Sequence, residues 1–165
     1  MRSRIIGAGR RRAVGVVAGL MVVAGSSGCT DSGSGGRMVD GTPASSVADI
    51  VKEASEFGGL VIPPDAKVLD ARTDRGIDTS YRIALSTDSA GVNALLTGSG
   101  ITPPLTRTYH VTVEIIAGPP LATSPSLLET GDRYQRPDGK HVSRDITVDE
   151  RDQTTRYVHI QLFDT

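Results

Sequence analysis

The 165-residue chain contains no tryptophan, only six phenylalanine and tyrosine residues and a single cysteine, Cys29. One cysteine excludes an intramolecular disulfide, although exported domains of this size often contain them. So few aromatic rings argue against the exposed stacking platforms that bind carbohydrate or single-stranded nucleic acid. The N-terminal apolar run, 13 to 25, is also shorter than the roughly 20 residues that a membrane-spanning helix needs.

Acidic residues are missing from the N-terminus, where the first acid is Asp31, whereas five arginines fall within the first twelve residues. An arginine-rich segment followed by a short apolar run predicts an export signal. From Cys29 onward, 13 basic side chains face 19 acidic ones, so that part of the chain has a formal charge of −6. Phosphate backbones would repel such a domain, and we expect no nucleic acid partner.

Small residues, Ser26 to Gly28, separate the apolar run from Cys29. This arrangement resembles the lipobox of bacterial lipoproteins, although Ser26 stands where the family usually has Leu, Val or Ile. The resemblance implies that the Cys29 thiol receives diacylglycerol and that residues 1–28 are then removed as a signal peptide. An ordinary secretory signal with a free thiol is the alternative. The arginine run 10–12 partly resembles a twin-arginine signal, so the export route stays open.

Residues 29–40 are rich in Ser and Gly and predict a flexible tether. Eleven such residues span about 18 Å on average, which holds a folded domain clear of the lipid headgroups. Two or three acyl chains, such as palmitate, would make the anchor stable. The layout resembles small exported lipoproteins of GC-rich Gram-positive bacteria, and it implies a location at the extracytoplasmic face of the cell membrane.

Residues 41–165 are expected to form one α+β domain with a mostly antiparallel sheet of about five strands and two helices packed on one face. A helix is predicted from Thr42-Pro43 to Gly58-Gly59 by apolar residues at helical spacing, and a short one after Thr87 or Asp88. The predicted strands are 66–73, 78–86, 107–116, a bent pair between 133 and 148, and 156–163.

Alternation in two of these strands predicts which side chains face the core. In strand 156–163, Val158, Ile160 and Leu162 are expected inside, and His159 and Gln161 are expected in water. In strand 107–116, the inward residues are Tyr109, Val111, Val113 and Ile115, and the outward residues are His110, Thr112 and Glu114. One face of the sheet would then be core and the other wet.

We predict no metal, cofactor or catalytic site. The three histidines (His110, His141 and His159) are scattered, and His110 and Glu114 would lie about 13 Å apart along a strand. The chain has neither a G-x-S-x-G elbow nor a Walker A loop. Gly98-Ser99-Gly100 is interpreted as a helix cap, and the charged residues Asp70, Arg72, Asp74, Arg75 and Asp78 as a salt-bridged turn.

These observations favour a non-enzymatic lipoprotein whose domain binds another envelope protein through its sheet face or through the loop 117–133. Tyr109 and Tyr157 could border such a groove. The alternative is a small-ligand-binding protein or a hydrolase, with a pocket between helix 42–58 and the sheet.

The anchoring hypothesis predicts that Cys29→Ser moves the protein out of the membrane fraction and leaves the precursor uncleaved, because lipid attachment precedes cleavage. Fractionation and mass spectrometry of the mature N-terminus are the measurements. An unmodified terminus, or one at any residue other than Cys29, would exclude lipidation.

Overall fold

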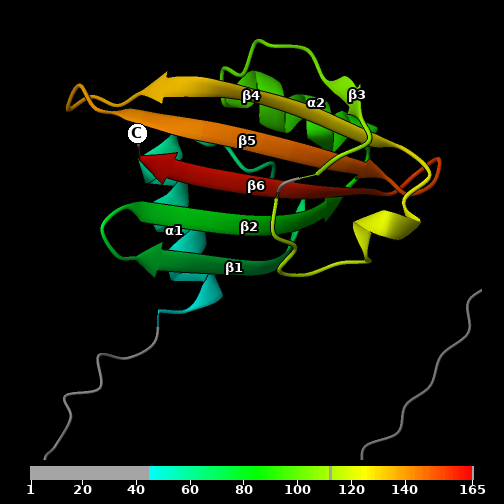
Figure 1. Cartoon of the computed structure of the whole chain (residues 1–165), viewed down its shortest axis with the longest axis horizontal. Helices are drawn as coiled ribbons and strands as arrows, with labels where there is room; N and C mark the ends of the chain where they lie inside the picture. Colours follow the sequence, from blue (N-terminus) through cyan, green and yellow to red (C-terminus); the bar gives the residue numbers. More distant parts are fainter. Residues whose placement is uncertain (1–44, 112, 165) are drawn as a thin grey trace, which may run out of the picture. The chain divides into compact units, whose positions relative to one another are not determined.

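The computed structural model describes residues 45–111 and 113–164. The chain divides into two units, Met1–Asp40 and Gly41–Thr165. The predicted signal peptide, Cys29 and the tether lie outside the described residues. The second unit contains a six-stranded antiparallel sheet in the order β1-β2-β6-β5-β4-β3 and two α-helices (Figure 1).

The α+β expectation is confirmed, with one strand more than about five. The helices are α1 (Val47–Gly58), α2 (Ser89–Gly98) and the single 3₁₀ turn η1 (Leu121–Thr123). The strands are β1 (Lys67–Arg75), β2 (Thr79–Thr87), β3 (Thr106–Thr108), β4 (Leu127–Gln135), β5 (His141–Glu150) and β6 (Arg156–Asp164).

Helix α1 begins at Val47, five residues after Thr42. Thr42, the predicted N-cap, lies outside the described residues. Ser46 is the N-cap because its hydroxyl accepts the backbone N–H of Asp49 at 3.2 Å. The Asp49 carboxylate accepts the Ser46 N–H in return, also at 3.2 Å, which completes a capping box. The predicted end is confirmed, since Gly59 closes the helix with a left-handed φ of 60°.

The next three elements agree with the sequence prediction. Strands β1 and β2 form the expected antiparallel hairpin. Helix α2 then starts behind Asp88, whose carboxylate accepts the backbone N–H of Gly91 at 2.8 Å. Among the described residues, no helix is long and apolar enough to span a bilayer.

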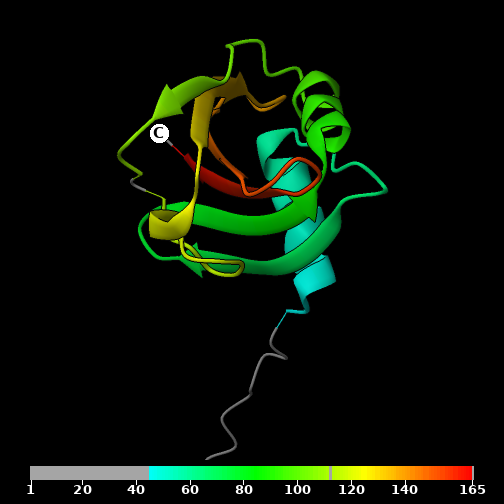
Figure 2. The ribbon, with the colours of Figure 1, turned by 90° about the vertical axis from the view of Figure 1, so that its right-hand side faces the viewer.

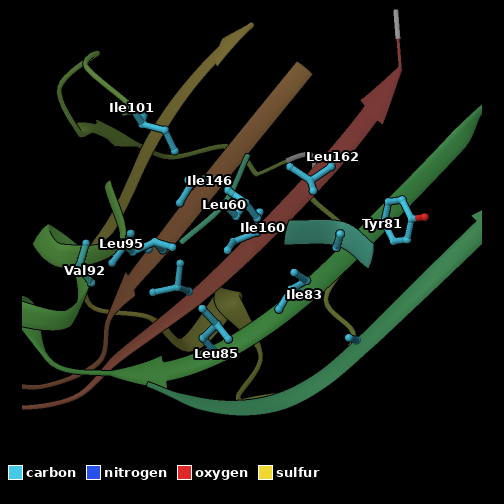
Figure 3. Close-up of a cluster of buried hydrophobic side chains, with 14 of the residues drawn as sticks. Leu60, Tyr81, Ile83, Leu85, Val92, Leu95, Ile101, Ile146, Ile160 and Leu162 are labelled. Atoms are coloured by element: carbon cyan, nitrogen blue, oxygen red, sulfur yellow. The ribbon is translucent and has the colours of Figure 1, made fainter. Parts of the chain in front are cut away.

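The core lies between the sheet and the two helices. In Figure 2 the sheet curves strongly, with α1 and α2 on one side of it and η1 on the other. Ile83, Ile146 and Ile160 from neighbouring strands are each 1% exposed and meet in the middle of this core (Figure 3). Burying one such side chain contributes about 1.5–3 kcal/mol. The predicted inward face of β6 is therefore correct.

The predicted strand 107–116 is wrong beyond its first residues, because β3 ends at Thr108. The Thr108 hydroxyl donates to the His110 carbonyl at 2.8 Å and accepts the His110 N–H at 3.3 Å. This local turn takes up backbone groups that a sheet ladder would use. Tyr109, expected in the core, is 81% exposed. Thr112 lies outside the described residues.

An arginine lies within the helix-side face of the sheet. Arg144 is 2% exposed and shares the inward side of β5 with Val142 and Ile146. Its guanidinium donates to the carbonyls of Gly58 at 3.1 Å and Ser99 at 2.9 Å, the C-terminal ends of α1 and α2. These carbonyls lack partners within their helices and carry the negative end of the helix dipole.

Two further donors of Arg144 are used by one carboxylate. Asp132 on β4 accepts from Nε at 2.7 Å and from Nη2 at 2.5 Å. The guanidinium carbon lies 5.0 Å from the centroid of the Tyr134 ring. One buried cation therefore joins both helix ends to two adjacent strands.

Arg144→Met should lower the free energy of unfolding by about 3–5 kcal/mol, because it leaves the Asp132 carboxylate and two helix-end carbonyls without their donor. Lys140→Met removes the same charge from an exposed hairpin residue and should change stability by about 0.5 kcal/mol or less. Urea unfolding of both variants measures the difference. Equal effects would show that Arg144 does not join the elements as described.

Candidate functional site

The sheet face opposite the helices is covered by residues 113–126, named here the crossing segment. Figure 1 shows the chain after β3 passing in front of the sheet. Glu114 forms an ion pair with Arg82 of β2. The Ile116 carbonyl accepts from Arg72 of β1 at 3.5 Å. The face expected to be wet is therefore shielded from water in its middle.

The far end of the crossing segment is attached through Asp149, which is fully buried at the end of β5. Its carboxylate accepts the Ser124 hydroxyl at 2.5 Å and Arg151 Nε at 3.0 Å. Arg151 also donates to the carbonyls of Thr123 at 2.9 Å and Pro120 at 3.2 Å. This network fixes η1 against the sheet.

His159 lies beneath the crossing segment. It points away from the helices, as predicted, but it is 2% exposed and not in water. A Cβ on Gly118 would lie 3.8 Å from the His159 Cε1 atom, so the segment packs directly on the ring. Neither ring nitrogen has a hydrogen-bond partner among the described residues. Alternation along the strand identified the face of His159, but not the segment that covers it.

Burial lowers the pKa of His159 below its ordinary value of about 6.5, and the nearby Asp149 carboxylate opposes this shift only in part. Desolvation disfavours the charged imidazolium. The ring is therefore neutral at pH 7.

A groove opens where the chain leaves β3 and returns at η1. It has a volume of about 410 Å³ and is named here the 109/121 groove. Tyr109 stands at its rim with the Arg107 guanidinium 5.8 Å from the ring centroid. Its lining is Arg107, Thr108, Tyr109, Val111, Leu121, Ala122, Ser124, Pro125, Ser126 and Leu127. Apolar and polar side chains are mixed in this lining, and one wall is formed by residues 121–127. The predicted loop 117–133 is wrong in its second half, because β4 begins at Leu127.

A second cleft of about 350 Å³ lies over β4 and β5 and contains Glu129 and Asp145. Burial, and then the charge of Glu129, raises the pKa of Asp145 above its ordinary value. Thr147, at the floor, donates to Glu129 at 3.5 Å. No third metal-ligating side chain joins these carboxylates, and no group of three or more His, Cys, Asp or Glu with metal-binding geometry occurs within the described ranges.

The structure does not bring the other sequence candidates together. His110 is exposed after β3, and His141 is exposed at the start of β5. Ser99 is the C-cap of α2, as predicted, and its hydroxyl accepts the Val61 N–H at 2.9 Å. The prediction of a salt-bridged turn is wrong in part, because Asp70, Arg72, Asp74 and Arg75 lie in strand β1 and only Asp78 lies between β1 and β2. Arg72 pairs with Asp70 at 3.1 Å.

A second ion pair from these charged residues reaches outside β1, because Arg75 pairs with Glu53 of α1. Helix α1 packs tightly on the sheet and lines neither cleft. Ala54 is fully buried, and a Cβ on Gly58 would come within 2.7 Å of Leu162. The alternative pocket between helix 42–58 and the sheet therefore has no space at these positions.

Comparison with family models, curated proteins and solved structures returned no match. The candidate site is therefore interpreted from its geometry. Sequence reasoning missed the Asp149, Arg151 and Ser124 network. A strand acid followed two residues later by an arginine was the only local signal, and nothing near Ser124 indicated its contact.

Asp149→Asn should lower the free energy of unfolding by about 1.5–3 kcal/mol, the range for hydrogen bonds to a charged group, and should increase amide exchange in residues 120–126. Asp138→Asn is the matched control, since its ion pair with Arg136 is exposed and spans 3.3 Å. Urea unfolding and hydrogen exchange test both variants. Equal exchange in 120–126 would show that Asp149 does not hold η1.

Proposed function

We propose that the protein is a lipid-anchored lipoprotein of the extracytoplasmic membrane face, and that its domain binds another envelope protein in the 109/121 groove. The arginine-rich N-terminus, the short apolar run and Cys29 support the anchor. The observation that carries the binding role is Tyr109, an aromatic side chain 81% exposed at the rim of a groove that mixes apolar and polar residues. Tyrosine and arginine are enriched among residues that dominate protein interfaces.

The groove is suited to binding because its second wall is fixed in place. Asp149 and Arg151 hold residues 120–124 against β5. A partner would therefore meet Leu121 and Leu127 already in position and would not lose affinity to the ordering of a loop. An apolar side chain of the partner could fill the space between Leu121 and Val111.

The charge of Arg107 indicates which group of the partner lies beside its apolar side chain. Arg107 stacks on Tyr109 but forms no ion pair within the described part of the chain. It is a basic residue in a domain with an acidic balance. A carboxylate of the partner would find a charge-assisted hydrogen bond at this position. The partner segment thus combines an apolar side chain with a neighbouring acid.

Small-ligand binding is a second candidate, and the cleft containing Glu129 and Asp145 favours it. A pocket of about 350 Å³ falls within the range of small-molecule sites. Two carboxylates would select a polar, cationic ligand. The groove carries the stronger argument because its exposed tyrosine has no evident structural role.

Tyr109→Ser should weaken binding of the purified partner by about tenfold or more, because truncating an interface hot spot costs about 2 kcal/mol. Arg107→Glu should weaken it further by repelling the acid. Ile77→Ser is the matched control, since Ile77 is also fully exposed but lies in the β1–β2 hairpin. The partner would first be cross-linked to the lipidated protein in its own envelope, and affinities would then be measured in solution. Unchanged affinity for Tyr109→Ser and Arg107→Glu would exclude the groove.

A further inference from the structure

His159 combines two properties that rarely occur together in a stable domain. It is 2% exposed, and both of its ring nitrogens lack partners among the described residues. Buried polar groups normally have a hydrogen bond, because leaving one unpaired costs free energy. Adding a proton to this ring would bury a charge as well. The closed arrangement of the crossing segment therefore tolerates neutral His159 and disfavours the imidazolium.

The surroundings offer little to stabilise a positive ring. The immediate cross-strand neighbours of His159 are Ala84 and Thr147, which carry no charge. The titratable and charged groups on the same face of the sheet around the ring are Asp70 of β1, Arg82 of β2, Glu129 of β4, Asp145 and Asp149 of β5, Tyr157 of β6, and Glu114 of the crossing segment.

Most of these groups are already engaged. Asp149 is paired with Arg151, and Glu114 is paired with Arg82. Asp70 is paired with Arg72. These acids therefore have cations of their own, and none donates or accepts a hydrogen bond at the His159 ring.

The crossing segment is attached to the sheet by polar contacts, whereas the core is held by apolar packing. Residues 113–126 are attached by the polar links of Glu114, Ile116 and Ser124. The helix-side core, in contrast, is a continuous apolar cluster. Local opening of a segment with few buried apolar contacts costs less free energy than unfolding of the core. Lifting the crossing segment is thus the easiest way to bring water to His159.

We propose that His159 is an acid-sensitive switch, and that its protonation releases residues 113–126 from the sheet while the helix-side core stays folded. The direction follows from linkage. The closed state binds the proton more weakly than the open state, so closure is fully favoured above pH 6.5, the value for a solvated histidine, and is progressively lost as pH falls below it. Each pH unit below that value, down to the pKa of the closed state, weakens closure by up to about tenfold.

Opening would also remove one wall of the 109/121 groove, so acid would release the proposed partner. That consequence rests on the proposed function. The switch itself does not, because it concerns a segment and a histidine of this chain. A test of segment opening therefore separates the two proposals.

Hydrogen exchange of the full-length protein in detergent, at pH 7.5 and 5.0 and corrected for the intrinsic pH dependence of exchange, tests the switch. Opening of residues 113–126 should increase at pH 5.0, by at most about thirtyfold for the 1.5 pH units below 6.5, while β2 and β6 stay protected. His159→Leu, similar in size and unable to titrate, should abolish the pH dependence. His141→Gln, which alters an exposed histidine, should retain it. An unchanged wild-type segment, or the same response in His159→Leu, would overturn the proposal.

A titration of the His159 ring by NMR keeps the proposal testable if His159→Leu fails to fold. His159 should protonate below pH 6.5, the ordinary value of a solvated histidine, and the signals of residues 113–126 should change with the same midpoint. A His159 midpoint at or above 6.5 would show that the ring is not shielded, and the proposal would fail.

Discussion

The guanidinium of Arg144 is the contact on which the arrangement of the domain depends. Helix α1 packs on β1, β2 and β5, and helix α2 packs on β2 and β6. Hydrogen bonds from one arginine to the Gly58 and Ser99 carbonyls fix both helix ends to the same point of β5. Asp132 orients the guanidinium from the adjacent strand. These hydrogen bonds set where both helices end on the sheet, in addition to the apolar side chains that fill the core.

The two faces of the sheet are covered by different means. On the helix side, apolar residues pack around that one charged group. On the other side, the crossing segment is attached by Glu114, Ser124 and the groups around Asp149, with His159 beneath it. The proposed switch depends on this polar attachment, because the described helix-side core has no comparable segment held by hydrogen bonds and ion pairs. The 109/121 groove lies where the crossing segment meets β3 and β4.

Sequence patterns correctly predicted the elements that are determined by residues close together in the sequence. The caps at Asp88 and Gly59 and the alternation in β6 follow from neighbouring residues, and the structure confirms them. The strand 107–116 failed because a Thr108 side chain competes for backbone hydrogen bonds and β3 has a partner on one side only. Arg144 lies on the same side of β5 as Val142 and Ile146, and an arginine is seldom fully buried unless it is paired. Its partners are far away in sequence, so no short window could reveal them.

The shortness of β3 leaves much of one border of the sheet open. Only Leu127, Leu128 and Glu129 of β4 pair with β3, so the rest of β4 is paired with β5 on one side and has no strand on its other side within the described residues. Exposed backbone of this kind can template pairing with another molecule. Asp132 and Arg133 place opposite charges along this border, and Gly131 weakens its strand propensity. These residues disfavour pairing with a second copy of the chain along the free side of β4.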